Sequence, residues 1–224
     1  MLPLNLRALA PYLPQLLGGL WLTLRVSAVA VAIELPLGLG GALLRTSRFP
    51  VVRSLVAGYV QVLRNVPLLI VLFALFYALP EFGVTLSPFT AGVLGLSLNG
   101  SAYTIEIFRG GLAGIAPGQR EAASSLGLRP HQVFLYIVFP QLLRISFPAL
   151  GNQVVGTTLV SSQTFFIGVA ELTSVTNNIG SVTFAYFEIF LIAGVLYVVA
   201  AQTLNQAWTQ LGRRLVGEDS GRGR

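Results

Sequence analysis

Residues 121–140 read EAASSLGLRPHQVFLYIVFP, and this stretch decides the fold because it punctuates two long apolar halves with polar residues. Pro117, just before it, stands where a first helical turn tolerates a missing N–H. Gly127 stands where a helix stops with a left-handed residue. The pattern predicts a helix of about ten residues, a turn at 127–130 and a second short helix ended by Pro140.

The composition is that of an integral membrane protein. Hydrophobic residues make up 54% of the 224 residues and charged residues 10%, whereas soluble domains carry about 25% charged residues. Mean hydropathy is +0.76, and several long runs carry no charge. The sequence therefore predicts an all-α protein that crosses a membrane several times.

The residue inventory excludes several kinds of site. The chain has no cysteine and one histidine, His131, which argues against a disulfide or a Cys/His metal centre. All 14 basic residues are arginines, and without the lysine of a Walker A loop the chain cannot supply a standard ATP site. The net charge of +6 need not indicate nucleic acid, because arginines gather on the cytoplasmic side of membrane proteins.

The placement of arginines predicts the topology. Apolar segments predict five transmembrane helices at about 14–44, 54–79, 89–108, 145–166 (broken by Pro148) and 184–211. Arginines occupy the loops at 45–53, at 109–144 and after 212, and are absent from 80–88 and 168–183. The positive-inside rule then places the N-terminus outside, the C-terminus inside and residues 121–140 in the cytoplasm.

The predicted organisation is one transmembrane domain with short ends. Residues 1–13 are expected to form a periplasmic or interfacial lead-in, and they lack a signal-peptide cleavage pattern. Residues 14–212 form the transmembrane domain, with its cytoplasmic loop at about 112–140 between the third and fourth helices. Residues 213–224 are polar and are expected to be disordered.

The stretch 121–140 resembles the EAA loop of bacterial ABC-importer permeases. That pattern is Glu-Ala-Ala, three residues, Gly, nine residues, Ile, any residue, Leu-Pro, and this chain departs from it only at Phe139. In that family the loop is the coupling helix that enters a cleft on the ATPase. The resemblance implies that Glu121, Ala122, Ala123 and Gly127 seat this helix on the ATPase. A self-contained interfacial helix is the alternative, and Arg129 and His131 are read as solvated or phosphate-facing.

The rest of the chain, over about residues 15–212, resembles permeases of the polar amino-acid branch of this family. The matching segments are Gly19-Leu-Trp-Leu-Thr-Leu, Arg64-Asn-Val-Pro-Leu-Leu, Ser97-Leu-Asn-Gly-Ser-Ala-Tyr, Glu106-Ile-Phe-Arg-Gly-Gly, Pro148-Ala-Leu-Gly-Asn and Ile167-Gly-Val-Ala-Glu-Leu-Thr. The resemblance implies a type I importer permease in the bacterial inner membrane that translocates polar amino acids. The resemblance also implies that the permease does no covalent chemistry and carries no cofactor, because ATP and Mg²⁺ bind to a partner ATPase.

The implied partners are an ABC ATPase dimer, a second permease that is identical or paralogous, and a periplasmic or lipid-anchored solute-binding protein. Many relatives carry Lys-Asp-Thr-Ser in the fourth span, where this chain has Leu159, Val160, Ser161 and Ser162. A cationic ligand would lose a carboxylate partner. The departure favours a neutral or acidic amino acid, or a heterodimer whose other half holds the ligand.

Polar residues within the apolar segments are candidates for the translocation pathway. A charge near mid-membrane costs at least ~2.5 kcal/mol and usually faces protein, so Glu34 is read as a pathway or subunit-contact residue, or as an internally hydrogen-bonded or protonated carboxyl. Arg64 either snorkels to the headgroups or lines the pathway. Asn65 and Pro67 predict a broken helix, a feature that often marks a site near the midplane.

Further pathway candidates come from the third and fourth spans. Four consecutive polar residues cover the whole circumference of a helix, so at least one must face protein or water; these are Ser161, Ser162, Gln163 and Thr164. Asn99 and Tyr103 are also candidates, whereas Ser101 and the run 38–41 are expected to pack helices together. No catalytic set can be assembled, which argues against a membrane enzyme. A self-sufficient secondary transporter is the alternative, although no inverted repeat is evident.

Overall fold

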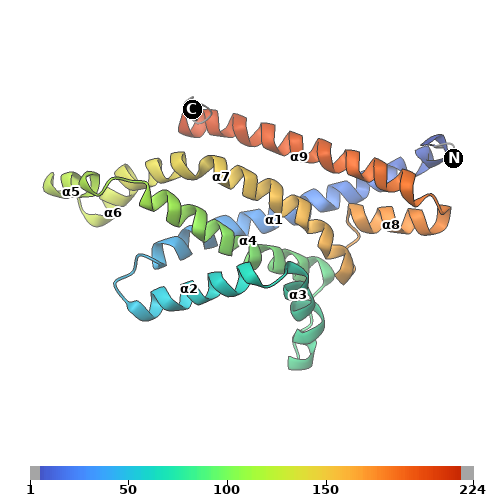
Figure 1. Ribbon diagram of the computed structural model, residues 1–224, viewed down its shortest axis with the longest axis horizontal. Coiled ribbons are helices and arrows are strands. Elements are labelled where there is room, and N and C mark those ends of the chain that lie inside the picture. The colour runs from blue at the N-terminus through green and yellow to red at the C-terminus, as the bar shows by residue number, and fades with distance from the viewer. Residues whose placement is uncertain (1–5, 218–224) are drawn as a thin grey trace.

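The computed structural model describes residues 6–217, and within that range every regular element is a helix, as predicted. The α-helices are α1 (Leu13–Leu44), α2 (Pro50–Asn65), α3 (Leu68–Phe73), α4 (Pro88–Ala113), α5 (Pro117–Ser125), α6 (Pro130–Gln132), α7 (Phe139–Val160), α8 (Leu172–Thr183) and α9 (Tyr186–Val216). Short 3-10 segments lie at Leu6–Tyr12, Leu79–Phe82 and Ser161–Ile167, and π segments at Ala74–Ala78 and Val133–Val138. Figure 1 shows the long helices α1, α4, α7 and α9 running roughly along one axis.

The helix α4 is the central element. It packs along α1 and also contacts α2 and α7, and more than half of its residues are buried. Close approach to α1 depends on glycines: a Cβ at Gly38 would overlap Thr104, and one at Gly41 would lie 2.5 Å from Ile105 Cδ1. These two glycines pack helices together as the sequence predicts. Gly40, from the same run, has open space around it.

Three helices are long and apolar enough to cross a membrane, at Leu9–Leu44, Pro130–Ile167 and Tyr186–Leu215, and the bent pair Pro50–Asn65 and Leu68–Phe82 makes a fourth if it counts as one span. The helix α4 is long enough to cross a membrane but is less hydrophobic than these helices. Its 26 residues would reach about 39 Å, and its buried face carries small and polar residues because it packs on protein rather than lipid. The count of five spans stays a prediction.

The predicted break in the second span is present. The α2 and α3 axes differ by 106° at Val66–Pro67, and the segment Leu68–Phe82, which we call the arm, projects from the bundle (Figure 1). Pro67 has no N–H to bond the Leu63 carbonyl four residues earlier. The Asn99 side chain of α4 donates to that carbonyl instead, with Nδ2 2.8 Å from the oxygen.

The region after α5 differs from the prediction in part. Gly127 ends the α5 turn with φ +80°, as predicted, but Pro140 does not end a helix. Pro130–Ile167 is one continuous helical segment, because the π turn at 133–138 directly precedes Pro140 and relieves the clash and the missing hydrogen bond. Pro148 likewise lies inside α7 without breaking it. Pro148 and Arg144, whose carbonyl it leaves unpaired, are both exposed.

Two segments outside the predicted spans contain helix. The segment 168–183 contains α8, and α9 continues through Val216, so residues 213–216 of the expected disordered tail are helix. Residues 218–224 of that tail, and residues 1–5 of the expected lead-in, lie outside the described residues. Within the lead-in, Leu6–Tyr12 is a 3-10 helix.

Candidate functional site

A polar cavity of about 450 Å³ lies between α2 and α4. It gathers three of the predicted pathway residues, further residues of α2 and α4, and the residue that directly follows α1; its lining is Arg45, Ala57, Val60, Gln61, Arg64, Asn65, Tyr103 and Glu106. The cavity lies beside the break at Pro67, because Arg64 and Asn65 are the last two residues of α2. Arg45, Gln61 and Glu106 are members that sequence reasoning missed.

The cavity carries excess positive charge. The Arg64 guanidinium lies over the Tyr103 ring, 5.3 Å from its centroid. Among the side chains that the structure describes, the only ion pair joins Arg109 Nη2 to Glu106 Oε2 at 2.7 Å. Arg45 and Arg64 form no ion pair with a described side chain, although both lie close enough to Glu106 for their charges to act on its carboxylate. The cavity therefore has the charge to attract a carboxylate group.

Two predicted pathway residues lie elsewhere and serve helix packing. Asn99 reaches the Leu63 carbonyl, as described above. Glu34 is fully buried where α1, α4 and α7 meet, and the Thr157 hydroxyl donates to its carboxyl oxygens at 3.1 and 3.3 Å. A Cβ at Gly100 would overlap Glu34 Oε2. Of the two interpretations of Glu34, the geometry matches the internal hydrogen bond.

The polar run at 161–164 forms a 3-10 segment at the end of α7. Ser161 and Thr164 are buried, whereas Ser162 and Gln163 are half-buried. The hydroxyls of the three Ser and Thr residues each donate to the carbonyl three residues earlier, at 2.7 to 2.8 Å. The arm packs against this segment, so the run lies beside the arm and outside the lining of the polar cavity.

A second buried carboxylate, Glu171, organises the far end of the bundle. It caps α8 by accepting from the backbone N–H groups of Thr173 and Ser174, both at 2.9 Å. It also accepts from the Tyr197 hydroxyl of α9 at 2.8 Å and from Thr23 of α1 at 3.4 Å. Burial raises the pKa of this carboxyl, and the hydrogen bonds oppose that shift. Glu171 thus ties three helices together, a role that its sequence position did not suggest.

The helix α5 and the turn after it, residues 117–127, form a mostly exposed segment that we call the α5 knob. Glu121, Ala122 and Gly127 are exposed, whereas Ala123 is buried in a cluster with Phe108 and other core residues. Leu126, at the C-cap of α5, has 83% of its surface exposed. An exposed leucine next to the glycine turn is an apolar contact point that sequence reasoning missed, although a lone leucine directly after a polar nine-residue helix could have indicated it.

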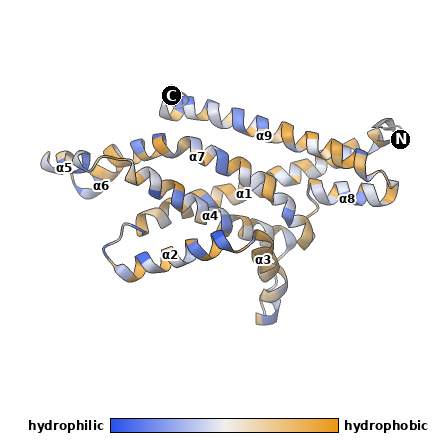
Figure 2. Ribbon diagram, viewed as in Figure 1, coloured by the Kyte–Doolittle hydropathy of each residue, from blue (hydrophilic) through white to orange (hydrophobic). Residues whose placement is uncertain are grey.

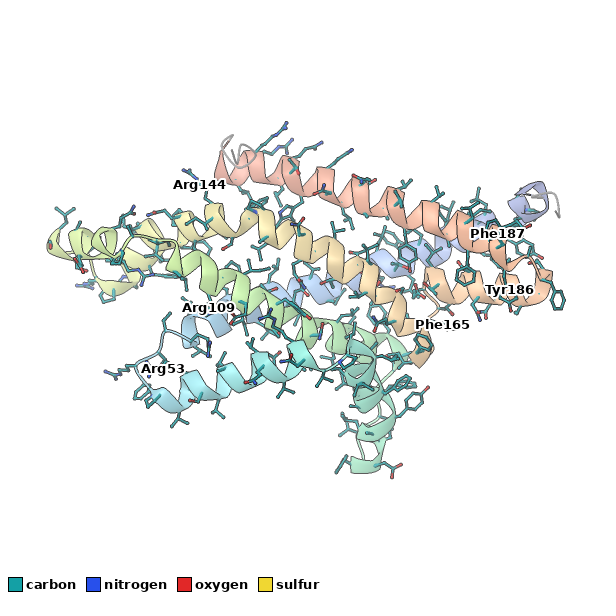
Figure 3. All side chains as sticks on the ribbon, in the orientation of Figure 1. Arg53, Arg109, Arg144, Phe165, Tyr186 and Phe187 are labelled. Atoms are coloured by element: carbon teal, nitrogen blue, oxygen red, sulfur yellow. The ribbon has the colours of Figure 1, made fainter. Side chains whose placement is uncertain are left out.

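The two ends of the bundle differ in chemistry. Figure 3 shows Arg53, Arg109 and Arg144 toward the end that carries α5, and Phe165, Tyr186 and Phe187 toward the opposite end. This separation is the pattern expected if the α5 end faces the cytoplasm. Over residues 6–217 no group of three or more His, Cys, Asp or Glu side chains could hold a metal ion.

Comparison with known proteins places this arrangement in a family. Residues 34–216 match the family described as binding-protein-dependent transport system inner membrane component. The chain is 34% identical to the nopaline transport system permease protein of Agrobacterium fabrum, covering 83% of this chain and 81% of the relative. It is 31% identical to a probable glutamine ABC transporter permease protein of Bacillus subtilis, covering 95% and 98%.

A solved structure, the crystal structure of an amino acid ABC transporter with histidines, superposes with a TM-score of 0.86 at 36% identity, covering 94% of this chain and 99% of that one. The structural likeness therefore extends over nearly the whole of this chain. The chain therefore belongs to the binding-protein-dependent transport system inner membrane component family, and it is a multi-pass inner-membrane permease subunit of an ABC importer.

Proposed function

We propose that this permease imports polar amino acids. We also propose that the α5 knob couples ATP hydrolysis on a partner ATPase to movement of the transmembrane helices. The observation that carries the proposal is the exposure of Glu121, Ala122, Leu126 and Gly127 at the arginine-bearing end of the bundle. An exposed apolar side chain beside a rigid turn is suited to enter a protein cleft. Ala123 packs on the core and holds the knob in place.

The coupling role is tested by blocking the knob without disturbing the fold. Ala122→Trp adds bulk at an exposed position and should abolish ligand-stimulated ATP hydrolysis in the reconstituted complex of permease, ATPase and binding protein. Val51→Trp, at an exposed position on α2, is the matched control and should retain it. If both variants hydrolyse ATP like the wild type, α5 is not the coupling element. Solute uptake by the purified chain alone would favour a secondary transporter instead.

The polar cavity between α2 and α4 is proposed to line the pathway. Arg64 and Arg45 form no ion pair with any side chain that the structure describes, so the cavity suits the carboxylate that every amino acid carries. Relatives are named for glutamine, arginine and nopaline, which leaves the side-chain preference open. Leu159 and Val160 stand where many relatives have Lys-Asp, so a neutral or acidic ligand is favoured. Competition of uptake by glutamine and glutamate, but not by arginine or lysine, is the expected result.

A second permease is proposed to cover the face of the bundle that carries the polar cavity and the arm. Arg64 and Asn65 are exposed in a chain that lies in a bilayer, where contact of a charge with lipid costs at least ~2.5 kcal/mol. The arm beside them exposes Ile70, Tyr77 and Phe82, and Figure 2 shows it mostly hydrophobic with a hydrophilic tip. A protein partner would cover both the polar cavity and the arm. A solute-binding protein is then expected at the opposite end from α5.

Cross-linking tests this face directly, because the chain has no cysteine. A short bifunctional thiol reagent should cross-link a single Tyr77→Cys variant in native membranes into a covalent homodimer. If the partner is a paralogous permease, the reagent should instead link the variant to a cysteine of that permease. Val198→Cys, at an exposed position on α9, is the control and should stay monomeric. The reverse pattern would place the partner on α9 and leave the polar cavity facing lipid.

A further inference from the structure

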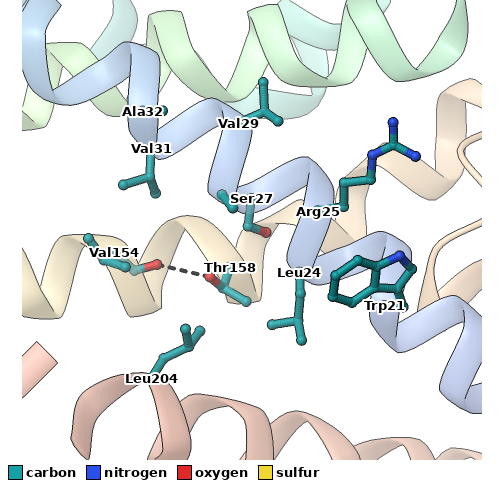
Figure 4. Close-up of a pocket in the computed structure, with 11 residues that line it drawn as sticks. Trp21, Leu24, Arg25, Ser27, Val29, Val31, Ala32, Val154, Thr158 and Leu204 are labelled. Atoms are coloured by element: carbon teal, nitrogen blue, oxygen red, sulfur yellow. Dashed lines mark hydrogen bonds between the residues drawn. The ribbon is translucent and has the colours of Figure 1, made fainter. Parts of the chain in front are cut away.

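An apolar groove of about 540 Å³ lies on the side of the bundle formed by α1, α7 and α9. Its wall includes Leu24, Ala28 and Ala32 of α1, Val154 and Thr158 of α7, and Leu204 of α9. Figure 4 shows the labelled side chains along these three helices, with Trp21 and Arg25 toward one end and the Arg25 guanidinium on the side of α1 away from Leu204. None of these residues belongs to the polar cavity or to the α5 knob.

Away from Trp21 and Arg25, the groove offers no free hydroxyl donor to a polar ligand. Its two hydroxyl groups are already used within their own helices: Ser27 donates to the Thr23 carbonyl at 2.8 Å and Thr158 donates to the Val154 carbonyl at 3.0 Å. An amino acid would lose its hydration there and gain nothing in return. A hydrocarbon chain fits the lining, because it removes apolar surface from contact with water or empty space.

One end of the groove is chemically different. Trp21 exposes 67% of its surface, and Arg25 lies one helical turn further on, with its guanidinium 5.4 Å from the centroid of the Phe89 ring. Arg25 has no ion-pair partner among the described side chains. Ala32 lies about 10 Å along α1 from Arg25, so the cation and the indole lie toward one end of the apolar groove.

We propose that this groove binds one anionic phospholipid, with an acyl chain between α1, α7 and α9 and its phosphate at Arg25. The Trp21 indole N–H is a second donor for the headgroup, in the role that tryptophan plays at membrane interfaces. The unpaired cation gives the site its preference for an anionic headgroup. This inference is independent of the transported ligand and of ATPase coupling, since it uses neither set of residues.

The test uses Trp21 as its own reporter. The chain has two tryptophans, so Trp208→Phe leaves Trp21 as the only one. The full chain is reconstituted in bilayers that contain increasing mole fractions of phosphatidylglycerol or phosphatidylcholine with brominated acyl chains, and quenching of Trp21 is measured at each mole fraction. One arginine near a membrane surface is worth about a fivefold preference for an anionic lipid. Brominated phosphatidylglycerol is therefore expected to quench at about fivefold lower mole fraction.

Variants separate the headgroup site from the groove. Arg25→Gln should remove the preference so that the two lipids quench alike, and Arg25→Lys should retain most of it. Ala32→Leu should weaken quenching by filling the groove. Arg53→Gln, which removes an exposed arginine elsewhere, should leave the preference unchanged.

Three results would overturn the proposal. Equal quenching of the wild type by both lipids would mean that Arg25 selects no headgroup. Absence of quenching by either lipid would mean that protein, such as a second copy, covers the groove. Loss of the preference in Arg53→Gln as well as in Arg25→Gln would trace it to overall charge rather than to this site.

Discussion

The helix α4 presents one closed face and one open face, and the two are built from neighbouring residues. Toward α1, Gly100 and Thr104 allow contact so close that added carbon atoms would overlap. Toward α2, Tyr103 and Glu106 border a polar cavity. The difference teaches that the polar residues of one membrane helix divide by direction: those facing a close helix hold the fold, and those facing a gap are free to meet a ligand.

The largest expected effect is at the closed face. Gly100→Ala would place a Cβ on the Glu34 carboxyl and should lower the free energy of unfolding by about 3 kcal/mol. Gly110→Ala, at an exposed position on the same helix with open space, is the control and should raise stability by about 0.5–1 kcal/mol, because alanine favours the helix over glycine. Thermal unfolding of the purified chain measures both. Adding Glu34→Ala to Gly100→Ala should recover part of the loss; purely additive losses would mean that the two residues do not compete for space.

A smaller effect is expected where α4 supports the broken helix. Asn99→Ala leaves the Leu63 carbonyl without its donor, which should cost about 1–3 kcal/mol. Asn152→Ala on α7, where the asparagine is exposed, should stay within about 0.5 kcal/mol. The same unfolding assay compares them. Equal stability of the two variants would show that water replaces the amide at Leu63.

Features set by a single residue were predictable from the sequence, and features set by neighbouring residues were not. The glycine turn at Gly127 and the break at Pro67 were predictable because each is set by one residue's backbone chemistry. The continuity of helix through Pro140 was not, because it depends on a π turn in the preceding six residues. The helix α4 falls short of the hydropathy test for a span because its buried face meets protein.

The candidate pathway shows the same division. Sequence position marks Glu34, Asn99 and Tyr103 equally as polar residues in apolar segments, yet only Tyr103 borders the cavity. Which side of a helix meets a gap is decided by tertiary packing, so it could not be read from one sequence. Glu106 was missed as a cavity residue for the same reason, since its pairing with Arg109 was evident but its neighbours on α2 were not.

At the open face, function should change while stability does not. Arg64→Gln removes an exposed, unpaired charge, so unfolding should shift by less than about 0.5 kcal/mol. Uptake by the reconstituted complex should fall about tenfold or more, because a hydrogen bond between two charged groups contributes roughly 1.5–3 kcal/mol. Arg53→Gln is the control for net charge. A destabilised Arg64→Gln protein with normal uptake would mean that Arg64 stabilises the fold and does not contact the ligand.

The smallest effect separates the ring of Tyr103 from its hydroxyl. The ring lies under the Arg64 guanidinium, and a cation–π contact at an exposed site is worth about 0.5–1 kcal/mol. Tyr103→Leu should therefore raise the KM for uptake about two- to fivefold by loosening Arg64, whereas Tyr103→Phe should leave it unchanged because the ring remains. A loss in Tyr103→Phe equal to that in Tyr103→Leu would show that the hydroxyl, and not the ring, is what the open face of α4 offers to the ligand.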